Sequence, residues 1–213
     1  MTGRRNKLLV LDGQGVVFDA PIKRFLANFA KDYQLSLMDI EARWESGLRE
    51  QAWRGLLDDE PLWNALAGRP VDAAHMRRRL DASYRPGPAA SSIADWSSKA
   101  QLWLLSNHRS AWLLPQLNAF GIAGRFTRVL ISDTTGFVKP EAAAFDPVFQ
   151  HLVAGHSVLF VDDQPHNVRA AEARGIHGVL AAPDGGWLDY VSGWLEGDDD
   201  GPTADAATTR TAF

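Results

Sequence analysis

The chain has 213 residues, 46% of them hydrophobic and 23% charged, which is the composition of an ordinary globular protein with one substantial core. Its formal net charge of -4 and isoelectric point near 5.8 argue against nucleic acid as a partner, because nucleic-acid-binding surfaces are basic. The lack of cysteine excludes disulfides and thiol chemistry, and no apolar run is long enough to span a membrane, so we expect a cytoplasmic protein without a membrane partner.

The first predicted element is a buried strand over residues 8–11, "LLVL", which ends at Asp12. At the exposed end of a strand, the carboxylate of Asp12 can act as a nucleophile or a metal ligand. The chain continues as "GQGVVFD" to a second aspartate, Asp19, shortly before Pro21. For Asp19 we predict a simpler role, the N-cap of a helix that starts at Pro21.

A helical insert is predicted for residues 20–90. Its first helix has an apolar stripe typical of a packed helix, formed by Ile22, Phe25, Leu26, Phe29 and Tyr33. Further helical segments follow to about residue 82 without a convincing strand, and "YRPGPAASS" (84–92) then breaks the pattern. We interpret 20–90 as a small helical cap over the edge of a sheet.

Three tryptophans of the insert, Trp44, Trp53 and Trp63, are expected to form its core, since a small helical bundle needs large apolar anchors. In the alternative reading, one of them faces the sheet and lines an apolar substrate pocket. The neighbouring arginines, Arg43, Arg49 and Arg54, are expected on the solvated surface, with binding of an anionic substrate as the alternative. The basic run Arg77–Arg79 is also expected on a solvated helix face.

After the insert, strands and helices alternate along the chain. Apolar runs predict strands, and apolar periodicity predicts helices, at 102–105, 109–120, 129–131, 141–152, 158–161 and 164–174. This alternation predicts an α/β fold: a Rossmann-like parallel sheet with helices on both faces and the helical cap inserted into it. We place the core at 1–19 and 91–197, the cap at 20–90 and a disordered tail at 198–213.

Polar residues follow the strands directly, and in a parallel sheet they would meet where ligands bind. Ser106 and Asn107 offer donors for a phosphoryl or carboxylate oxygen, and Lys139 in "GFVKPE" supplies a cation. Asp162 and Asp163 could hold Mg²⁺, which prefers hard oxygen ligands. The simpler readings are a helix N-cap for the first pair and a favourable helix dipole for the second pair.

These motifs, in this order, resemble those of the haloacid dehalogenase superfamily, in the branch with a helical cap between the first strand and the second motif. The resemblance covers about residues 8–180 and depends on "LDGQGVVFD", "LLSN", "VKP" and "VLFVDDQPHNVRAAEARG". It implies that Asp12 is a nucleophile that forms an aspartyl-phosphate. It also implies that Ser106 and Asn107 bind the phosphoryl group and that Lys139 neutralises charge on Asp12 and on the transferring group.

The resemblance further implies a Mg²⁺ site. Its ligands would be the carboxylates of Asp12, Asp162 and Asp163 and the backbone carbonyl of Gln14, with Asn167 supporting them from behind.

The chain departs from the family's phosphatases at the side chain of Gln14. Those enzymes place an aspartate there, which protonates the leaving oxygen and later deprotonates the attacking water. An amide exchanges no proton near neutral pH, and general acid–base catalysis contributes about 10²–10⁴ in rate. Gln14 therefore predicts reduced turnover, or a leaving group that departs without a proton, such as an acyl phosphate or a halide. His108 and His166 are alternative candidates for the missing base.

We therefore predict a hydrolase of the haloacid dehalogenase type that acts on a small phosphorylated or activated anionic metabolite. The alternatives are a catalytically degenerate binding protein, or a dehalogenase, transferase or lyase of the same fold. The family's dehalogenases have no metal, yet Asp162 and Asp163 near Asp12 would repel it without a cation, which favours phosphoryl chemistry. Neither the substrate nor the oligomeric state follows from the sequence.

Overall fold

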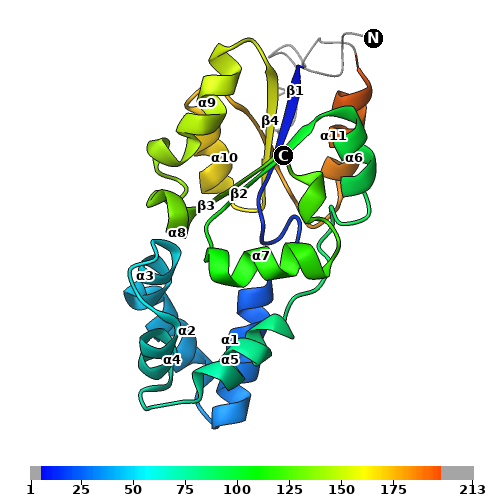
Figure 1. Ribbon diagram of the computed structural model, residues 1–213. Helices are drawn as coiled ribbons and strands as arrows, with labels where there is room; N and C mark the ends of the chain where they lie inside the picture. The colour runs from blue at the N-terminus through cyan, green and yellow to red at the C-terminus, as the bar shows by residue number, and fades with distance from the viewer. Residues whose placement is uncertain (1–5, 198–213) are drawn as a thin grey trace, which may run out of the picture.

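The computed structural model describes residues 6–197, so the tail predicted to be disordered, 198–213, lies outside the described residues. Five parallel strands form one sheet in the order β3-β2-β1-β4-β5 (Figure 1). The strands are β1 (Lys7–Leu11), β2 (Gln101–Ser106), β3 (Arg128–Ile131), β4 (Ser157–Asp162) and β5 (His177–Leu180). The predicted α/β class with a parallel sheet is confirmed.

Helices cover both faces of the sheet, as predicted (Figure 1). Leu9 and Leu11 of β1 face one core, and Leu8 and Val10 face the other, as the alternation of a strand requires. The first core is covered by α6 (Ile93–Lys99), α7 (Ser110–Ala119) and α11 (Gly186–Glu196). The second core is covered by η4 (Ala142–Phe145), α9 (Asp146–Val153) and α10 (Pro165–Glu172). The predicted helix over 141–152 is thus divided into η4 and α9.

Strand β5 was not predicted, because its sequence "HGVL" has no long apolar run and its residues at the sheet edge are partly buried or, at Leu180, exposed. Gly178 lies in this strand against α10, where an added Cβ would come within 2.7 Å of Val168 Cγ1. The close approach of helix and strand accounts for a glycine in this edge strand.

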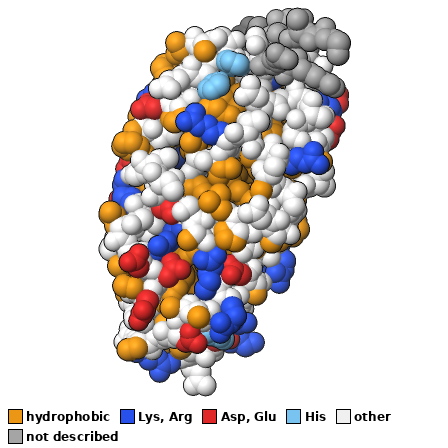
Figure 2. All heavy atoms as spheres, viewed as in Figure 1, with side chains coloured by type: hydrophobic (Ala, Val, Ile, Leu, Met, Phe, Trp, Pro, Cys, Tyr) orange, Lys and Arg blue, Asp and Glu red, His pale blue; other side chains and the backbone are white. Residues whose placement is uncertain are grey.

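Between β1 and α6 the named elements are all helices, and they lie beyond the carboxyl end of the sheet (Figure 1). They are α1 (Pro21–Tyr33), α2 (Leu37–Arg43), η2 (Trp44–Leu48), α3 (Arg49–Trp53), α4 (Asp59–Ala67) and α5 (Ala73–Asp81). We call these helices the cap. Charged side chains of both signs gather over the cap in Figure 2. None of the helices in residues 6–197 is long and apolar enough to cross a membrane.

The three tryptophans of the cap are buried, as predicted. The rings of Trp44 and Trp53 meet edge to face at 5.3 Å within the cap. Trp63 stacks on Trp112 of α7 with ring centroids 5.0 Å apart, and Trp53 packs on His108 at 5.1 Å. Trp53 and Trp63 therefore belong to the core and also contact the sheet domain, and the alternative that one of them lines a substrate pocket stays a prediction.

Two antiparallel segments, 16–19 and 85–89, connect the cap to the sheet domain. Backbone hydrogen bonds join them directly: Asp19 N–H donates to the Arg85 carbonyl at 3.1 Å, and Gly87 N–H donates to the Val17 carbonyl at 2.8 Å. A Cβ at Gly87 would lie 2.5 Å from the Val16 carbonyl oxygen, so only glycine allows this approach. We call this pair of segments the tether ribbon.

The prediction that Asp19 caps α1 is wrong. The N-cap position is Ala20, which has φ 27° and forms no side-chain cap. Asp19 lies one residue further out, and its exposed carboxylate pairs with the Arg24 guanidinium instead. Arg24 also donates to the Ser83 carbonyl at 2.6 Å, so the pair fixes α1 to the end of the cap.

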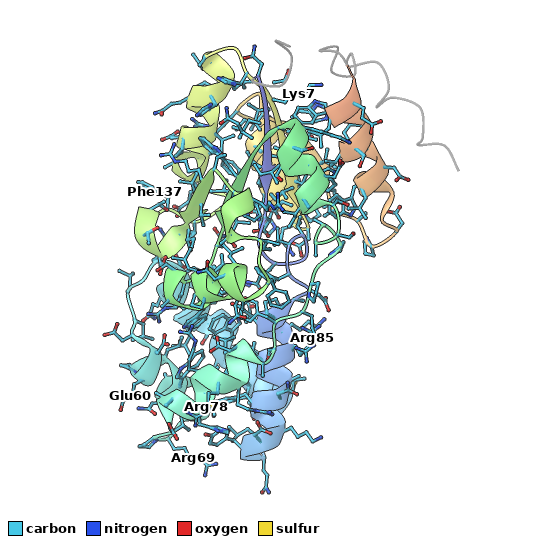
Figure 3. The ribbon with its side chains drawn as sticks, turned by 45° about the vertical axis from the view of Figure 1, so that its right-hand side comes forward. Lys7, Glu60, Arg69, Arg78, Arg85 and Phe137 are labelled. Atoms are coloured by element: carbon cyan, nitrogen blue, oxygen red, sulfur yellow. The ribbon has the colours of Figure 1, made fainter. Side chains whose placement is uncertain are left out.

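The basic run Arg77–Arg79 lies on α5, and of the three only Arg78, labelled in Figure 3, is exposed. The other two arginines form ion pairs with Asp81 and Asp32.

Candidate active site

The acidic residues that end β1 and β4 meet at the carboxyl end of the sheet. These strands are neighbours, and Asp12 N–H extends their ladder by donating to the Val161 carbonyl at 2.9 Å. As a result, carboxylate oxygens of Asp12, Asp162 and Asp163 all lie within 4.8 Å of one another. Asp12 and Asp162 are buried, and Asp163 is partly exposed.

Lys139 reaches this cluster from the loop after α8 (Ser132–Thr135) and is itself buried. Its Nζ donates to Asp12 Oδ1 at 2.8 Å, to Asp162 Oδ2 at 2.6 Å and to the Leu105 carbonyl at 2.8 Å. Sequence analysis missed Leu105, since a backbone acceptor leaves no signal in the residue type. The ammonium thus bridges the two buried carboxylates.

The side chain of Asn107 holds the main chain of Lys139. Its Nδ2 donates to the Lys139 carbonyl at 2.7 Å, and its Oδ1 accepts from Lys139 N–H at 2.8 Å. The structure therefore gives Asn107 a positioning contact that sequence analysis did not anticipate. Neither residue of the predicted pair caps α7, whose N-cap is Arg109 with no side-chain cap.

Ser106 presents a buried hydroxyl that has no hydrogen-bond partner among the described residues. The hydroxyl lies against the loop after Asp12, because a Cβ at Gly13 would come within 2.5 Å of Ser106 Oγ. A buried, unpartnered hydroxyl is costly unless a ligand or water completes it. Its place beside Asp12 suits a donor to an anionic group bound there.

The cluster carries excess negative charge. Burial raises the pKa of Asp12 to about 7; Lys139 opposes this shift, and the charges of Asp162 and Asp163 add to it. Burial and the neighbouring Asp162 also raise the pKa of Asp163. Burial disfavours the charged form of Lys139, but the two adjacent carboxylates outweigh it and raise its pKa. Three carboxylates facing one ammonium leave room for a further positive charge.

The donor set fits a hard divalent cation such as Mg²⁺. Both oxygens of Asp162 are occupied: they accept from Gln164 N–H at 2.8 Å, from Asn167 Nδ2 at 3.0 and 3.1 Å, and from Lys139. Asp163 instead lies over Gly15, where an added Cβ would be 2.5 Å from Asp163 Oδ2. The oxygens without a hydrogen bond among the described residues are thus Asp12 Oδ2 and Asp163 Oδ1, since Asp163 Oδ2 accepts from Gln164 Nε2 at 2.9 Å. Asn167 orients Asp162 through its two hydrogen bonds.

Gln14 lies between two glycines in the loop that follows Asp12 and is partly buried. The loop is closed by hydrogen bonds from Gly15 N–H to the Phe18 carbonyl at 2.7 Å and from Phe18 N–H to the Gly13 carbonyl at 2.8 Å. The backbone geometry of a compact active-site loop is therefore intact. The side chain at position 14 is an amide, which exchanges no proton near neutral pH.

The two histidines proposed as substitute bases lie in different environments. His108 is fully buried; its Nδ1 accepts from Arg109 N–H at 2.8 Å, so its Nε2–H donates to Tyr84 Oη at 3.1 Å. Burial lowers the pKa of His108 to about 3. A histidine with both nitrogens bonded and such a low pKa is a poor general base near neutral pH. His166 is exposed at the start of α10.

The buried His108 has a consequence for stability. The unfolded chain takes up a proton on this imidazole below about pH 6.5, whereas the folded protein does so only near pH 3. The free energy of unfolding should therefore fall as the pH decreases through this window, by up to about 1.4 kcal/mol per pH unit from this residue. Urea unfolding of wild type and His108→Gln between pH 4.5 and 7.5 measures the difference in slope. His166→Gln is the exposed control, and an equal change of slope in both variants would contradict the assignment.

Two of the cap arginines lie apart from the acidic cluster. Arg43 donates to the Leu66 carbonyl at 2.9 Å, and Arg49 pairs with Glu45 one turn earlier at 2.8 Å. Both contacts are within the cap; Arg49 is exposed, as predicted, whereas Arg43 is partly buried.

Carboxylates and a buried lysine meet at the carboxyl edge of a parallel sheet, below a helical cap. This arrangement is that of an α/β enzyme fold. The chain belongs to the haloacid dehalogenase-like hydrolase family, whose family model matches residues 10–175. No curated protein matches the sequence.

Solved structures of this family share the fold. The HAD family enzyme BT-2542 from Bacteroides thetaiotaomicron is 22% identical with a TM-score of 0.70, covering 86% of this chain and 98% of its own. A predicted HAD-like family hydrolase from Porphyromonas gingivalis is 21% identical with a TM-score of 0.70, covering 90% of this chain and 98% of its own. The L-2-haloacid dehalogenase from Xanthobacter autotrophicus is 21% identical with a TM-score of 0.60, covering 88% and 83%.

Proposed function

We propose that the protein is a Mg²⁺-dependent hydrolase of a small anionic metabolite that carries a phosphoryl group. The observation that carries the proposal is the buried cluster in which Lys139 Nζ bridges Asp12 and Asp162 beside the free oxygens of Asp12 and Asp163. A crystal structure of BT-2542 in complex with magnesium and inorganic phosphate supports the choice of cofactor and substrate class.

In this mechanism the free Oδ2 of Asp12 attacks phosphorus, and the bond to the leaving oxygen breaks with its electron pair. Water then attacks the phosphorus of the aspartyl-phosphate, and the bond to Asp12 Oδ2 breaks, which releases inorganic phosphate and restores the carboxylate. Lys139 keeps Asp12 charged and oriented through Oδ1, 2.8 Å away, and offsets charge on the transferring group. Ser106 Oγ donates to a phosphoryl oxygen. Mg²⁺, held by Asp12, Asp163 and the Gln14 carbonyl with Asp162 behind them, would supply charge neutralisation of the phosphoryl oxygens.

Gln14 determines which substrates suit this site. A sugar or alcohol phosphate leaves as a basic alkoxide that needs a proton, and the amide provides none. Lack of the acid costs about 10²–10⁴ in the rate of phosphoryl transfer to Asp12, and it affects an acyl phosphate least, because its carboxylate leaves unprotonated. Lack of the base slows the later attack of water equally for every substrate. We therefore propose an activated phosphate, such as an acyl phosphate, as the substrate class.

Displacement of halide is the second candidate, favoured by Gln14 because a halide also leaves without a proton. It ranks lower because the acidic cluster of Asp12, Asp162 and Asp163 calls for a cation, whereas attack on carbon needs none.

Beryllium fluoride, a mimic of a phosphoryl group on aspartate, tests the proposal. With Mg²⁺ it should load Asp12 and stabilise the protein, by about 2.7 kcal/mol at 100 times its dissociation constant. Thermal unfolding and ¹⁹F NMR of the bound species provide the measurement, with Asp12→Asn as the isosteric control. Loading that is absent in the wild type, together with no hydrolysis of acetyl phosphate, would favour the non-catalytic binding protein.

A further inference from the structure

Arg54 is the third cap arginine, and it connects the cap to the sheet domain. It lies at the end of α3, which packs beside α8 at the edge of the sheet domain (Figure 1). Its guanidinium forms an ion pair with Glu141 and donates from Nη1 to the Gly136 carbonyl at 3.0 Å. Its Nε is oriented from behind by Glu50 at 3.0 Å. One cap side chain therefore holds both ends of the segment 136–141, whose Phe137 is labelled in Figure 3.

Segment 136–141 is the loop that carries Lys139. Glu141 closes it into a turn: its N–H donates to the Val138 carbonyl at 2.8 Å, and its Oε2 accepts from Val138 N–H at 3.2 Å. Asn107 holds the Lys139 main chain with the two hydrogen bonds described above. The turn is therefore held by Asn107 from the sheet and by Arg54 from the cap.

We propose that Arg54 is a positioning residue, which acts through Glu141 and the Gly136 carbonyl to hold Lys139 Nζ against Asp12 when the cap is seated. The inference rests on the proposed function, in which Lys139 serves the reaction at Asp12. Arg54 lies outside the predicted motifs, so the contact between the cap and the Lys139 turn becomes part of the arrangement needed for activity.

The chemistry of the contact requires an arginine. A guanidinium presents donors in several fixed directions, and here they reach Glu141, Gly136 and Glu50 at once. A lysine keeps the charge but cannot span the three acceptors. Consistent with the pair, hydrogen bonding to Arg54 lowers the pKa of Glu141. The side chains are 23% and 38% exposed, so the pair adds little to global stability, and its effect should appear in positioning.

Arg49 provides the matched control. It lies on the same helix and forms the same kind of pair with a glutamate one turn earlier, but it has no hydrogen bond or ion pair to the sheet domain in residues 6–197. We compare Arg54→Gln, Arg54→Lys and Glu141→Gln with Arg49→Gln in the full-length protein with Mg²⁺. The measurements are kcat and KM for acetyl phosphate, the thermal midpoint, and hydrogen exchange of the Val138 and Lys139 amides.

The Arg54 variants should lower kcat by about 10- to 100-fold with KM within about twofold, because small displacements of a catalytic group are costly. The midpoint should fall by at most about 4 °C. Exchange of the Val138 and Lys139 amides should accelerate, and Arg54→Lys should not restore kcat. Arg49→Gln should match the wild type in all measurements.

Exchange and kcat in Arg54→Gln that match those of Arg49→Gln would overturn the inference and leave the proposed function intact. If the wild type neither hydrolyses acetyl phosphate nor loads beryllium fluoride, the proposed function fails on its own. In that case amide exchange decides whether Arg54 orders the turn: unchanged exchange overturns the inference, and faster exchange supports the positioning contact.

Discussion

Replacing Gln14 with aspartate is expected to raise hydrolysis of an alkyl phosphate by about 10²–10⁴-fold, because it supplies the missing acid and base. The gain should be smaller for an aryl phosphate and smallest for acetyl phosphate, whose leaving group needs no proton. The loop around position 14 is already closed by its backbone hydrogen bonds, so the new carboxylate enters a formed site. Steady-state kcat/KM for the three substrates with Mg²⁺ measures the effect.

Gln14→Asn is the control, since it keeps an amide and should produce no gain. Asp12→Asn combined with Gln14→Asp should abolish the acquired activity, because the attacking oxygen is removed. An unchanged rate in Gln14→Asp for every substrate would mean that the site has diverged in more than this one group.

Lys139→Met is expected to abolish activity and to destabilise the protein at pH 7.5 by about 3–5 kcal/mol, the usual cost of leaving a buried charge unpaired. Without the ammonium, Asp12 and Asp162 repel each other, and the pKa of Asp12 rises further above its unfolded value. The folded state then binds more protons than the unfolded state, so the deficit is largest near pH 7.5 and shrinks as the pH falls toward 4. Urea unfolding of both proteins across this range measures it.

Added Mg²⁺ should reduce the deficit of Lys139→Met at pH 7.5, because it supplies positive charge to the same carboxylates. Lys7→Met is the matched control: Lys7 is also buried, but its Nζ donates to the backbone carbonyls of Trp194 and Gly197. Its deficit should not shrink at low pH or with Mg²⁺. The same response in both variants would mean that the loss at Lys139 reflects packing alone.

The strands of the core could be predicted because each apolar run is uninterrupted and is followed directly by polar residues. The adjacency of Asp12 and Asp162 then follows from the parallel pairing of β1 with β4. The edge strand β5 was missed, since an edge needs few apolar residues and tolerates Gly178. The prediction that Asp19 is the N-cap residue of α1 was wrong. The N-cap is Ala20, whose left-handed backbone conformation no residue pattern signals.

The side-chain partners within the site were less predictable. An amide such as that of Asn107 can bind a ligand or a backbone equally well, and its two bonds to Lys139 depend on the path of a distant loop. The burial of His108 depends on Tyr84 and Trp53, which belong to the long segment between β1 and β2. Contacts between segments far apart in sequence are set by tertiary packing, so local patterns do not show them.

The tether ribbon restricts how the cap can move relative to the sheet. Its two segments are fastened to each other by backbone hydrogen bonds and by the close approach of Gly87, so neither can lengthen or slide independently. Any displacement of the cap relative to the sheet domain would then be a rotation about the tether ribbon. Residues of the cap far from the tether ribbon would then move furthest. A spectroscopic probe on α3 should detect such a rotation, whereas a probe beside Arg85 should scarcely detect it.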